Sequence, residues 1–285
     1  MQSTTVVLVL GASGMLGSAV LRLIAPSAGY RVVGALRSDA AAAMLPPESR
    51  SAVRSGLNLE NLAALFEEVR PDVVINCIGV VKQLHEADDP LIVIPINSLL
   101  PHRLLRLCKA NGARLIHVST DCVFSGSKGG YREDDVADAR DLYGLSKLLG
   151  EVDDENAITL RTSMIGHELG TPHGLLGWFL SKRGRVMGYR RAIFSGLPTV
   201  ELARVMRDFI IPNPGLRGVF HVSADPISKY DLLRLIAATY GSSCEISPND
   251  EVVVDRSLDS TKFRLATGYI APKWPHLIQA MHLFG

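Results

Sequence analysis

The chain has 285 residues, and 47% of them are hydrophobic, which is enough for one large α/β domain or a domain and a half with a sizeable core. Its 30 Lys and Arg offset 29 Asp and Glu, so the net charge of +1 gives no general attraction for nucleic acid or an anionic membrane. The cysteines, at positions 77, 108, 122 and 244, show neither close pairing nor zinc spacing, which fits reduced thiols in a cytosol.

The first apolar stretch, residues 6–10, stops at Gly11 and is too short for the hydrophobic part of a signal peptide. No uninterrupted apolar run approaches the length that spans a bilayer. We therefore expect a soluble, cytoplasmic protein that binds neither nucleic acid nor membrane.

Predicted strands and helices alternate over the first 165 residues. Apolar, β-favouring runs predict strands at residues 6–10, 30–36, 72–77, 114–118 and 157–161. Helical spacing of apolar residues predicts helices at residues 15–24, 62–69, 98–111 and 140–152, the third interrupted near its start by Pro101. This alternation is typical of a parallel sheet covered by helices on both faces.

Beyond residue 165 the alternation weakens. Residues 166–188, 198–211 and the tail from 228 are interpreted as shorter helices and loops around one further strand at 218–222. The expected fold is α/β, with a doubly wound Rossmann-type domain over residues 1–165 that the strand near 218–222 rejoins. Most of residues 166–285 is expected to form a smaller substrate-binding lobe that shares its core.

A glycine-rich turn joins the first predicted strand to the first predicted helix, and it reads Gly11, Ala12, Ser13, Gly14, Met15, Leu16 and Gly17. Backbone N–H groups and the positive end of the helix dipole converge at such a turn, which suits a pyrophosphate. Gly11 permits the tight turn, Gly14 lets phosphates approach the backbone, and Gly17 lets the helix pack close to the sheet. Glycines also punctuate ordinary loops, but the order strand, turn, helix favours a dinucleotide site.

The end of the second predicted strand indicates which dinucleotide is bound. An NAD site normally places an acidic residue there, on the ribose 2′-hydroxyl, whereas this chain has Arg37 and Ser38. Arginine pairs bidentately with a 2′-phosphate, and serine can donate a hydrogen bond to it. NADP(H) is therefore the predicted cofactor, with NAD(H) as the alternative.

Tyr143 and Lys147 lie four residues apart in a predicted helix, so their side chains emerge from one face. A neighbouring ammonium favours the ionised form of a phenol and so lowers its pKa. Alone, such a pair is usually a solvated surface feature. Here the strand at 114–118 also delivers Thr120 to the carboxyl edge of the sheet, where ligands of open α/β sheets bind.

These three features, in this order, resemble the hallmarks of the extended short-chain dehydrogenase/reductases. The resemblance implies that Thr120 hydrogen-bonds the substrate oxygen, that Tyr143 exchanges a proton with it, and that Lys147 contacts the nicotinamide ribose and lowers the Tyr143 pKa. It also implies that Asn97 serves a proton relay. By the same resemblance the cofactor cleft is lined by Cys77, Ile78 and Gly79.

Within this superfamily the chain is similar over nearly its whole length to the dTDP-4-dehydrorhamnose reductase family. The similarity is carried by residues 70–76, 119–124, 143–147, 150–151, 160–163 and 196–199. It implies a hydride transfer from NADPH to the C4 ketone of a nucleotide-linked 4-keto-6-deoxyhexose, in polysaccharide biosynthesis, by a homodimer.

Several departures from the family pattern bear on the substrate. Cys122 replaces the usual aromatic, Asn58 stands where relatives often have an Asp near the adenine, and the pair Lys82-Gln83 follows the cofactor-cleft segment. Lys82 is a candidate for a cofactor phosphate or a substrate hydroxyl, with a plain surface lysine as the equal alternative. The candidate substrate-binding residues are Lys82, Thr120, Asp121, Cys122, Tyr143 and Arg191.

Other functions stay open. A sugar-nucleotide dehydratase needs a second carboxyl group after Asp121, and Cys122 stands there, which disfavours dehydration. A 4-epimerase uses the same trio of Thr120, Tyr143 and Lys147. A catalytically idle module that binds NADP to stabilise a partner complex is the alternative from another class.

The remaining polar candidates have structural interpretations. His117 and His221 lie in predicted strands and are expected to be packed histidines, and no cluster has the spacing of metal ligands. Asp138 and Asp141 are expected to cap the helix that carries Tyr143.

Overall fold

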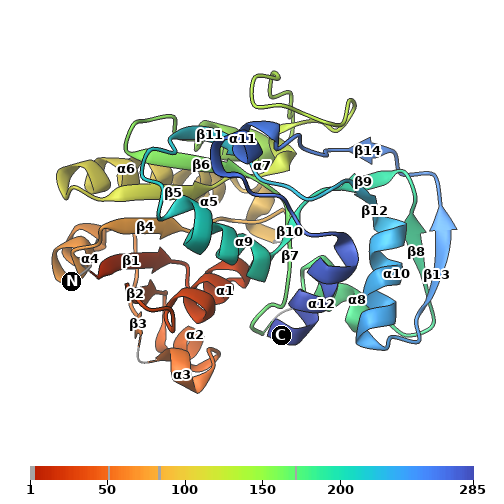
Figure 1. The fold of residues 1–285 in the computed structure, drawn as a ribbon, viewed down its shortest axis with the longest axis horizontal. Coiled ribbons are helices and arrows are strands. Elements are labelled where there is room, and N and C mark those ends of the chain that lie inside the picture. The colour runs from red at the N-terminus through yellow and green to blue at the C-terminus, as the bar shows by residue number, and fades with distance from the viewer. Residues whose placement is uncertain (1–3, 51, 83–84, 171) are drawn as a thin grey trace.

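The computed structural model describes residues 4–50, 52–82, 85–170 and 172–285, so Gln83 of the Lys82-Gln83 pair lies outside the described residues. Its centre is a parallel sheet of seven strands in the order β11-β6-β5-β4-β1-β2-β3 (Figure 1). The strands are β1 (Thr5–Leu10), β2 (Tyr30–Ala35), β3 (Val53–Arg54), β4 (Val73–Asn76), β5 (Arg114–Val118), β6 (Ala157–Arg161) and β11 (Gly218–His221). This order confirms the predicted doubly wound α/β fold, and β3 is an edge strand that the sequence pattern did not indicate.

Strand β1 is apolar from Val6 to Leu10 because both of its faces are covered. Val7 and Val9 belong to a hydrophobic cluster with α1 (Met15–Ile24), α9 (Thr199–Val205) and α12 (Trp274–Phe284). Leu8 and Leu10 belong to a second cluster with α4 (Leu62–Val69) and α6 (Leu100–Ala110). The first cluster runs from β1 to α12, so the two parts of the chain share one core.

The helix expected at residues 98–111 begins earlier than expected. The short helices η1 (His85–Asp88) and α5 (Pro90–Val93) are followed by a π-helical turn, η2 (Ile94–Leu99), which continues into α6. The π-helical turn accommodates Pro101, which lacks a backbone N–H. It leaves the Asn97 carbonyl oxygen against Gly150, where a Cβ would approach it to 1.9 Å.

This continuous helix, Pro90–Ala110, is long and apolar enough to cross a membrane by length and composition alone. Polar residues from Asn97 to Lys109 interrupt it, so it contains no uninterrupted apolar run of that length, as predicted. Leu100, Leu104 and Cys108 of this helix are completely buried against the sheet, as in the core helix of a globular fold.

The part of the chain beyond residue 165 contains more strands than expected. Three small sheets pair β10 (Leu197–Pro198) with β7 (Met164–Ile165), β13 (Glu245–Asn249) with β8 (Arg185–Tyr189), and β9 (Ala192–Phe194) with both β12 (Ile227–Ser228) and β14 (Val254–Asp255). Their partners are distant in the chain, so a local pattern of two to five residues does not reveal them. With α8 (Leu175–Leu180) and α10 (Lys229–Tyr240), β8 and β13 form the end of the molecule opposite α4 and α6 (Figure 1).

A buried ion pair fastens the helix α7 (Leu142–Leu149) to the sheet. Glu151, just beyond α7, accepts hydrogen bonds from Arg161 Nε at 2.8 Å and Nη2 at 2.7 Å, and from Ser119 Oγ at 2.7 Å. The Arg161 and Glu151 side chains are 8% and 7% exposed, and the guanidinium also lies over the Phe124 ring. The contact therefore joins the ends of β5 and β6 to the helix that carries Tyr143.

We expect Glu151→Gln to lower the free energy of unfolding by about 3 kcal/mol, because it leaves Arg161 charged, buried and facing an amide donor. Urea denaturation measures this. Glu68→Gln is the matched control, because it removes the exposed ion pair with Arg54 and should cost less than about 1 kcal/mol. Equal effects of the two substitutions would contradict the structural role of the buried pair.

Candidate active site

The glycine turn packs directly against the end of β4. Gly11 has φ +78°, and a Cβ there would lie 3.2 Å from the Cys77 backbone and from Ile78 Cγ1. At Gly17 a Cβ would lie 2.1 Å from the Gly11 carbonyl oxygen. The two glycines therefore allow α1 and the neighbouring loop to meet at the point where the strand order reverses between β1 and β4, which is the usual ligand crevice of such sheets.

The N-terminus of α1 opens at this crevice without a side-chain cap. The N-cap residue is Gly14, so no side chain at this position caps the first backbone amides of the helix, and the first turn contains no acidic residue. A Cβ at Gly14 would contact the Gly11 carbonyl oxygen alone, at 3.3 Å. The backbone amides of Met15, Leu16 and Gly17 at this helix end fit an anion such as a pyrophosphate, with Ser13 beside them.

The end of β2 lies beside the same turn. Gly11 and Ala12 both donate their backbone N–H to the Ala35 carbonyl oxygen, at 3.0 and 3.1 Å. Arg37, two residues further, is exposed and enters no ion pair of the described residues, and Ser38 caps the short helix α2 (Asp39–Ala43). The backbone thus places Arg37 just beyond the end of β2, the strand that adjoins the glycine turn.

Asn58, which is predicted to lie near an adenine, holds the turn before α4. Its side-chain oxygen accepts the backbone N–H groups of Glu60 and Asn61, each at 2.8 Å, in the turn before α4. Asn58 is exposed, and its acceptor is used to hold this turn.

Thr120, Tyr143 and Lys147 come together at the carboxyl end of β5. Thr120 follows β5 and caps the short helix η3 (Asp121–Val123), where its hydroxyl accepts the Cys122 N–H at 3.1 Å. Lys147 is 5% exposed and donates from Nζ to the Val118 carbonyl oxygen at 2.8 Å, and a Cβ at Gly79 would lie 4.0 Å from the same Nζ. Lys147 therefore lies between the strand that precedes Thr120 and the loop that borders the glycine turn.

Burial sets the protonation of the Tyr143 and Lys147 side chains. It raises the pKa of Tyr143 well above its ordinary value, and a side-chain hydrogen bond with Thr120 acts in the opposite direction. Burial lowers the pKa of Lys147 to about 8, and the charges of Glu151 and Cys77 oppose this shift. Burial of the phenol is the largest influence on its pKa, and Lys147 donates to the Val118 carbonyl oxygen, so the lowering of the Tyr143 pKa by Lys147 stays a prediction.

Asn97, expected in a proton relay, makes structural contacts with its side chain. It accepts the Val80 N–H at 2.9 Å and donates to the Val80 carbonyl oxygen at 3.0 Å and to Ser146 Oγ at 3.2 Å. Its side chain joins η2 to α7 and to the loop after β4.

Lys82 and Arg191, two candidate substrate ligands, are exposed. Lys82 donates to Asp141 Oδ2 at 3.0 Å, while Asp141 Oδ1 accepts the Gly144 N–H at 2.9 Å and caps α7 as predicted. Asp138, the other predicted cap, instead accepts from Ser125. Arg191 lies between β8 and β9, next to Arg190, which is paired with Asp250.

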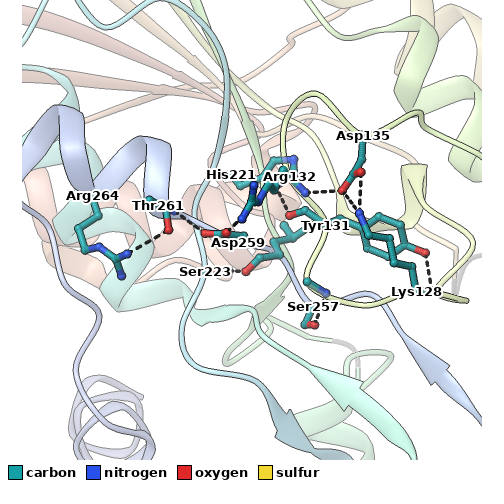
Figure 2. Close-up of polar contacts among 12 residues, drawn as sticks. Lys128, Tyr131, Arg132, Asp135, His221, Ser223, Ser257, Asp259, Thr261 and Arg264 are labelled. Carbon is teal, nitrogen blue, oxygen red and sulfur yellow. Dashed lines mark hydrogen bonds and ion pairs between the residues drawn. The ribbon is translucent and has the colours of Figure 1, made fainter.

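Polar contacts join the loop after η3 to the tail of the chain (Figure 2). Tyr131 donates its backbone N–H to the Ser257 carbonyl oxygen at 2.9 Å, and its own carbonyl oxygen lies 3.0 Å from His221 Nδ1. In the same segment of the tail, Arg256 donates a hydrogen bond from Nε to the Phe124 carbonyl oxygen at 2.8 Å. The contact with Tyr131 shows His221 as a packed histidine, as predicted.

His117 is buried as predicted, but one of its ring nitrogens lacks a partner. Its Nδ1 lies 3.1 Å from Asn76 Nδ2, and its buried Nε2 has no hydrogen bond within the described residues. Among the same residues, no group of three His, Cys, Asp or Glu side chains is arranged to hold a metal ion.

Two cations near the trio, Arg256 and Lys229, are not among the predicted site residues, although the segment that begins at Arg256 weakly resembles the tail where relatives place substrate-lobe side chains. Both Arg256 and Lys229 act electrostatically on Asp121, which follows Thr120. Lys229 also lines a cavity of about 270 Å³ together with His173, Trp178 and Tyr189. Lys229 had no sequence signal, because it approaches Asp121 only through the packing of α10.

Comparison with known proteins identifies the family. The model of the RmlD substrate binding domain matches residues 5–262. The chain belongs to this family. The result confirms the resemblance to the extended short-chain dehydrogenase/reductases that the glycine turn, Thr120 and the Tyr143/Lys147 pair indicate.

Individual relatives include a reductase and a subunit of another enzyme. The chain is 28% identical to a probable low-salt glycan biosynthesis reductase of Haloferax volcanii over 88% of its own length and 83% of the relative's. It is 30% identical to methionine adenosyltransferase 2 subunit beta of Xenopus laevis, over 82% of this chain and 71% of that one.

A solved structure has the same fold. It is dTDP-4-dehydrorhamnose reductase of Bacillus anthracis in complex with NADP, with a TM-score of 0.79 and 19% identity, and the match covers 98% of this chain and 99% of that one.

We expect Gly17→Ala to lower the free energy of unfolding by about 2 kcal/mol or more, because its Cβ would collide with the Gly11 carbonyl oxygen. Gly14→Ala is the matched control in the same turn and should cost less than about 1 kcal/mol, since its φ of −72° suits alanine. Thermal and urea unfolding compare the two variants. A Gly14→Ala variant that is the less stable of the pair would contradict the packing described here.

Proposed function

We propose that this protein is a reductase that uses NADPH to reduce the 4-keto group of a nucleotide-linked 6-deoxyhexose in polysaccharide biosynthesis. The observation that carries the proposal is the juxtaposition of Thr120, Tyr143 and Lys147 at the sheet edge, beside the uncapped N-terminus of α1. The named reductase among the relatives supports the reaction class.

The dinucleotide would be held by residues of the crevice. The backbone amides of Met15, Leu16 and Gly17 suit its pyrophosphate, and Arg37 and Ser38 suit a 2′-phosphate. The segment 77–79 and Lys147 border the space between the glycine turn and Thr120. When bound, NADPH supplies the hydride.

The chain's own side chains supply the proton and its orientation. The raised pKa of Tyr143 keeps the phenol protonated at neutral pH, which is the form needed to protonate the oxygen of a ketone under reduction. Thr120 provides a second hydroxyl beside it. Lys147, with a pKa of about 8, is largely charged at neutral pH and adds a positive charge at the site.

The regulatory alternative has its own support. A subunit of methionine adenosyltransferase is 30% identical over 82% of this chain, and a subunit named as such need not carry out the reduction itself. The trio in this chain is intact, which favours the reductase. The homodimer and the cytoplasmic location stay predictions from the sequence.

We expect the purified protein to oxidise NADPH with at least one member of a panel of dTDP-, UDP- and GDP-linked 4-keto-6-deoxyhexoses. Tyr143→Phe should lower kcat by about 100-fold or more, because the proton donor is lost, with little change in NADPH affinity. Tyr30→Phe is the control, since that hydroxyl bonds the Arg207 carbonyl oxygen, far from the trio. NADPH binding without turnover of any sugar would instead favour the regulatory role.

Arg37→Ala should weaken NADPH binding by roughly tenfold, because a charge-assisted pair with the 2′-phosphate is removed, and should leave NADH binding nearly unchanged. Calorimetric titration of both dinucleotides measures this difference. Arg103→Ala, which removes an exposed charge from α6, is the control. Tighter binding of NADH than NADPH by the unmodified protein would refute the assignment.

A further inference from the structure

The carboxyl group of Asp121 is buried beside Thr120 with few partners. Both residues are 7% exposed, and Asp121 Oδ1 lies 3.3 Å from Thr120 Oγ1. No ion pair of the described residues includes Asp121. By contrast, the nearby buried carboxylate of Glu151 accepts hydrogen bonds from the Arg161 guanidinium and from the Ser119 hydroxyl. A buried carboxyl group without such partners favours its neutral form.

The groups that act on Asp121 come from four segments of the chain, namely η3 with Thr120, the segment after β14, α10 and α7. Burial raises its pKa, and the opposing influences are a hydrogen bond with Cys122, the charge of Arg256, the bond to Thr120 and the charge of Lys229. Tyr143 adds a neutral phenol on the side of α7. Neither cation lies within ion-pair distance, so neither replaces the hydration that the carboxylate has lost.

The Thr120 hydroxyl has one proton to donate and two lone pairs that accept. The Cys122 N–H occupies one lone pair, at 3.1 Å. An ionised Asp121 can only accept, so it takes the Thr120 proton and leaves a lone pair facing Tyr143. A neutral Asp121 can donate to the second lone pair, and the Thr120 proton then has to point elsewhere, toward the space beside the phenol.

A ketone oxygen that gains negative charge during reduction requires donors, not lone pairs. We propose that Asp121 is a positioning residue: in its neutral form it donates to Thr120 Oγ1 and thereby directs the Thr120 hydroxyl proton at the substrate oxygen. This inference rests on the proposed reductase function. It gives Asp121 a role through Thr120, distinct from direct proton transfer to the sugar.

The kinetic test compares Asp121→Asn with Asp121→Ala over the whole pH range in which the protein stays folded. In the unmodified enzyme kcat should fall as the pH rises through the pKa of Asp121, which burial raises above its ordinary value. Asp121→Asn, whose amide donates at every pH, should keep kcat within about threefold of the low-pH value and lose that decline. Asp121→Ala leaves the Thr120 hydroxyl without a partner that orients it. Its kcat should therefore lie between that of Asp121→Asn and that of the unmodified enzyme at a pH where Asp121 is ionised.

Thr120→Val is the benchmark for complete loss of this donor, expected to cost about 100-fold in kcat. Asp225→Asn, which removes a carboxylate from an exposed pair with Lys273, is the control for an aspartate-to-asparagine change. If kcat falls as far in Asp121→Asn as in Thr120→Val, the proposal is overturned, because the carboxyl group itself is then needed. A kcat that rises as Asp121 ionises would overturn it as well.

A second measurement does not depend on activity. Carbon-13 NMR of the aspartate carboxyl groups, with Asp121 assigned by its absence in Asp121→Asn, should show Asp121 titrating above the ordinary value of about 3.9 and still protonated at the pH of maximal kcat. An Asp121 carboxyl group that is already ionised at that pH refutes the positioning role even in an active enzyme. If no 4-keto sugar is reduced but Asp121 titrates high, the proposed function fails and the assignment of a neutral Asp121 stands.

Discussion

The parallel direction of all seven central strands is the constraint on which the site depends. Because each strand ends at the same edge of the sheet, the glycine turn after β1, the loop after β4 and Thr120 after β5 meet there. The tight contact between Gly11 and the Cys77 backbone then fixes the spacing between two of these loops. A parallel sheet buries both of its faces, so the same constraint explains why its strands are nearly all apolar.

Charge is distributed unevenly around this edge. Glu151 and Arg161 form a buried and well bonded pair that ties α7 to the sheet. Asp121 and Lys147 are buried without such a carboxylate or guanidinium partner, and burial moves the pKa of each toward its neutral form. Groups paired with each other give rigidity, whereas groups left without a partner are those whose protonation can change during a reaction.

Much of this was predictable because it is local. Both α1 and β5 have the predicted bounds, since the apolar period and Pro26 define the helix and a continuous apolar run defines the strand. The small sheets beyond residue 165 were missed, because β8 meets β13 only after the intervening chain has folded. The helix at 98–111 was given too late a start, because proline predicts a break that a π-helical turn avoids.

The sequence by itself determined the family, the order of the main strands and the helical spacing of Tyr143 and Lys147, because these follow from residue types at short separations. The tertiary structure alone decided which charges these residues meet. Lys229, Arg256 and Asp121 belong to three segments far apart in the chain, and their common neighbourhood arises from packing. Burial, the cause of the pKa shifts at Tyr143 and Lys147, is likewise a property of the folded chain, since no single residue carries it.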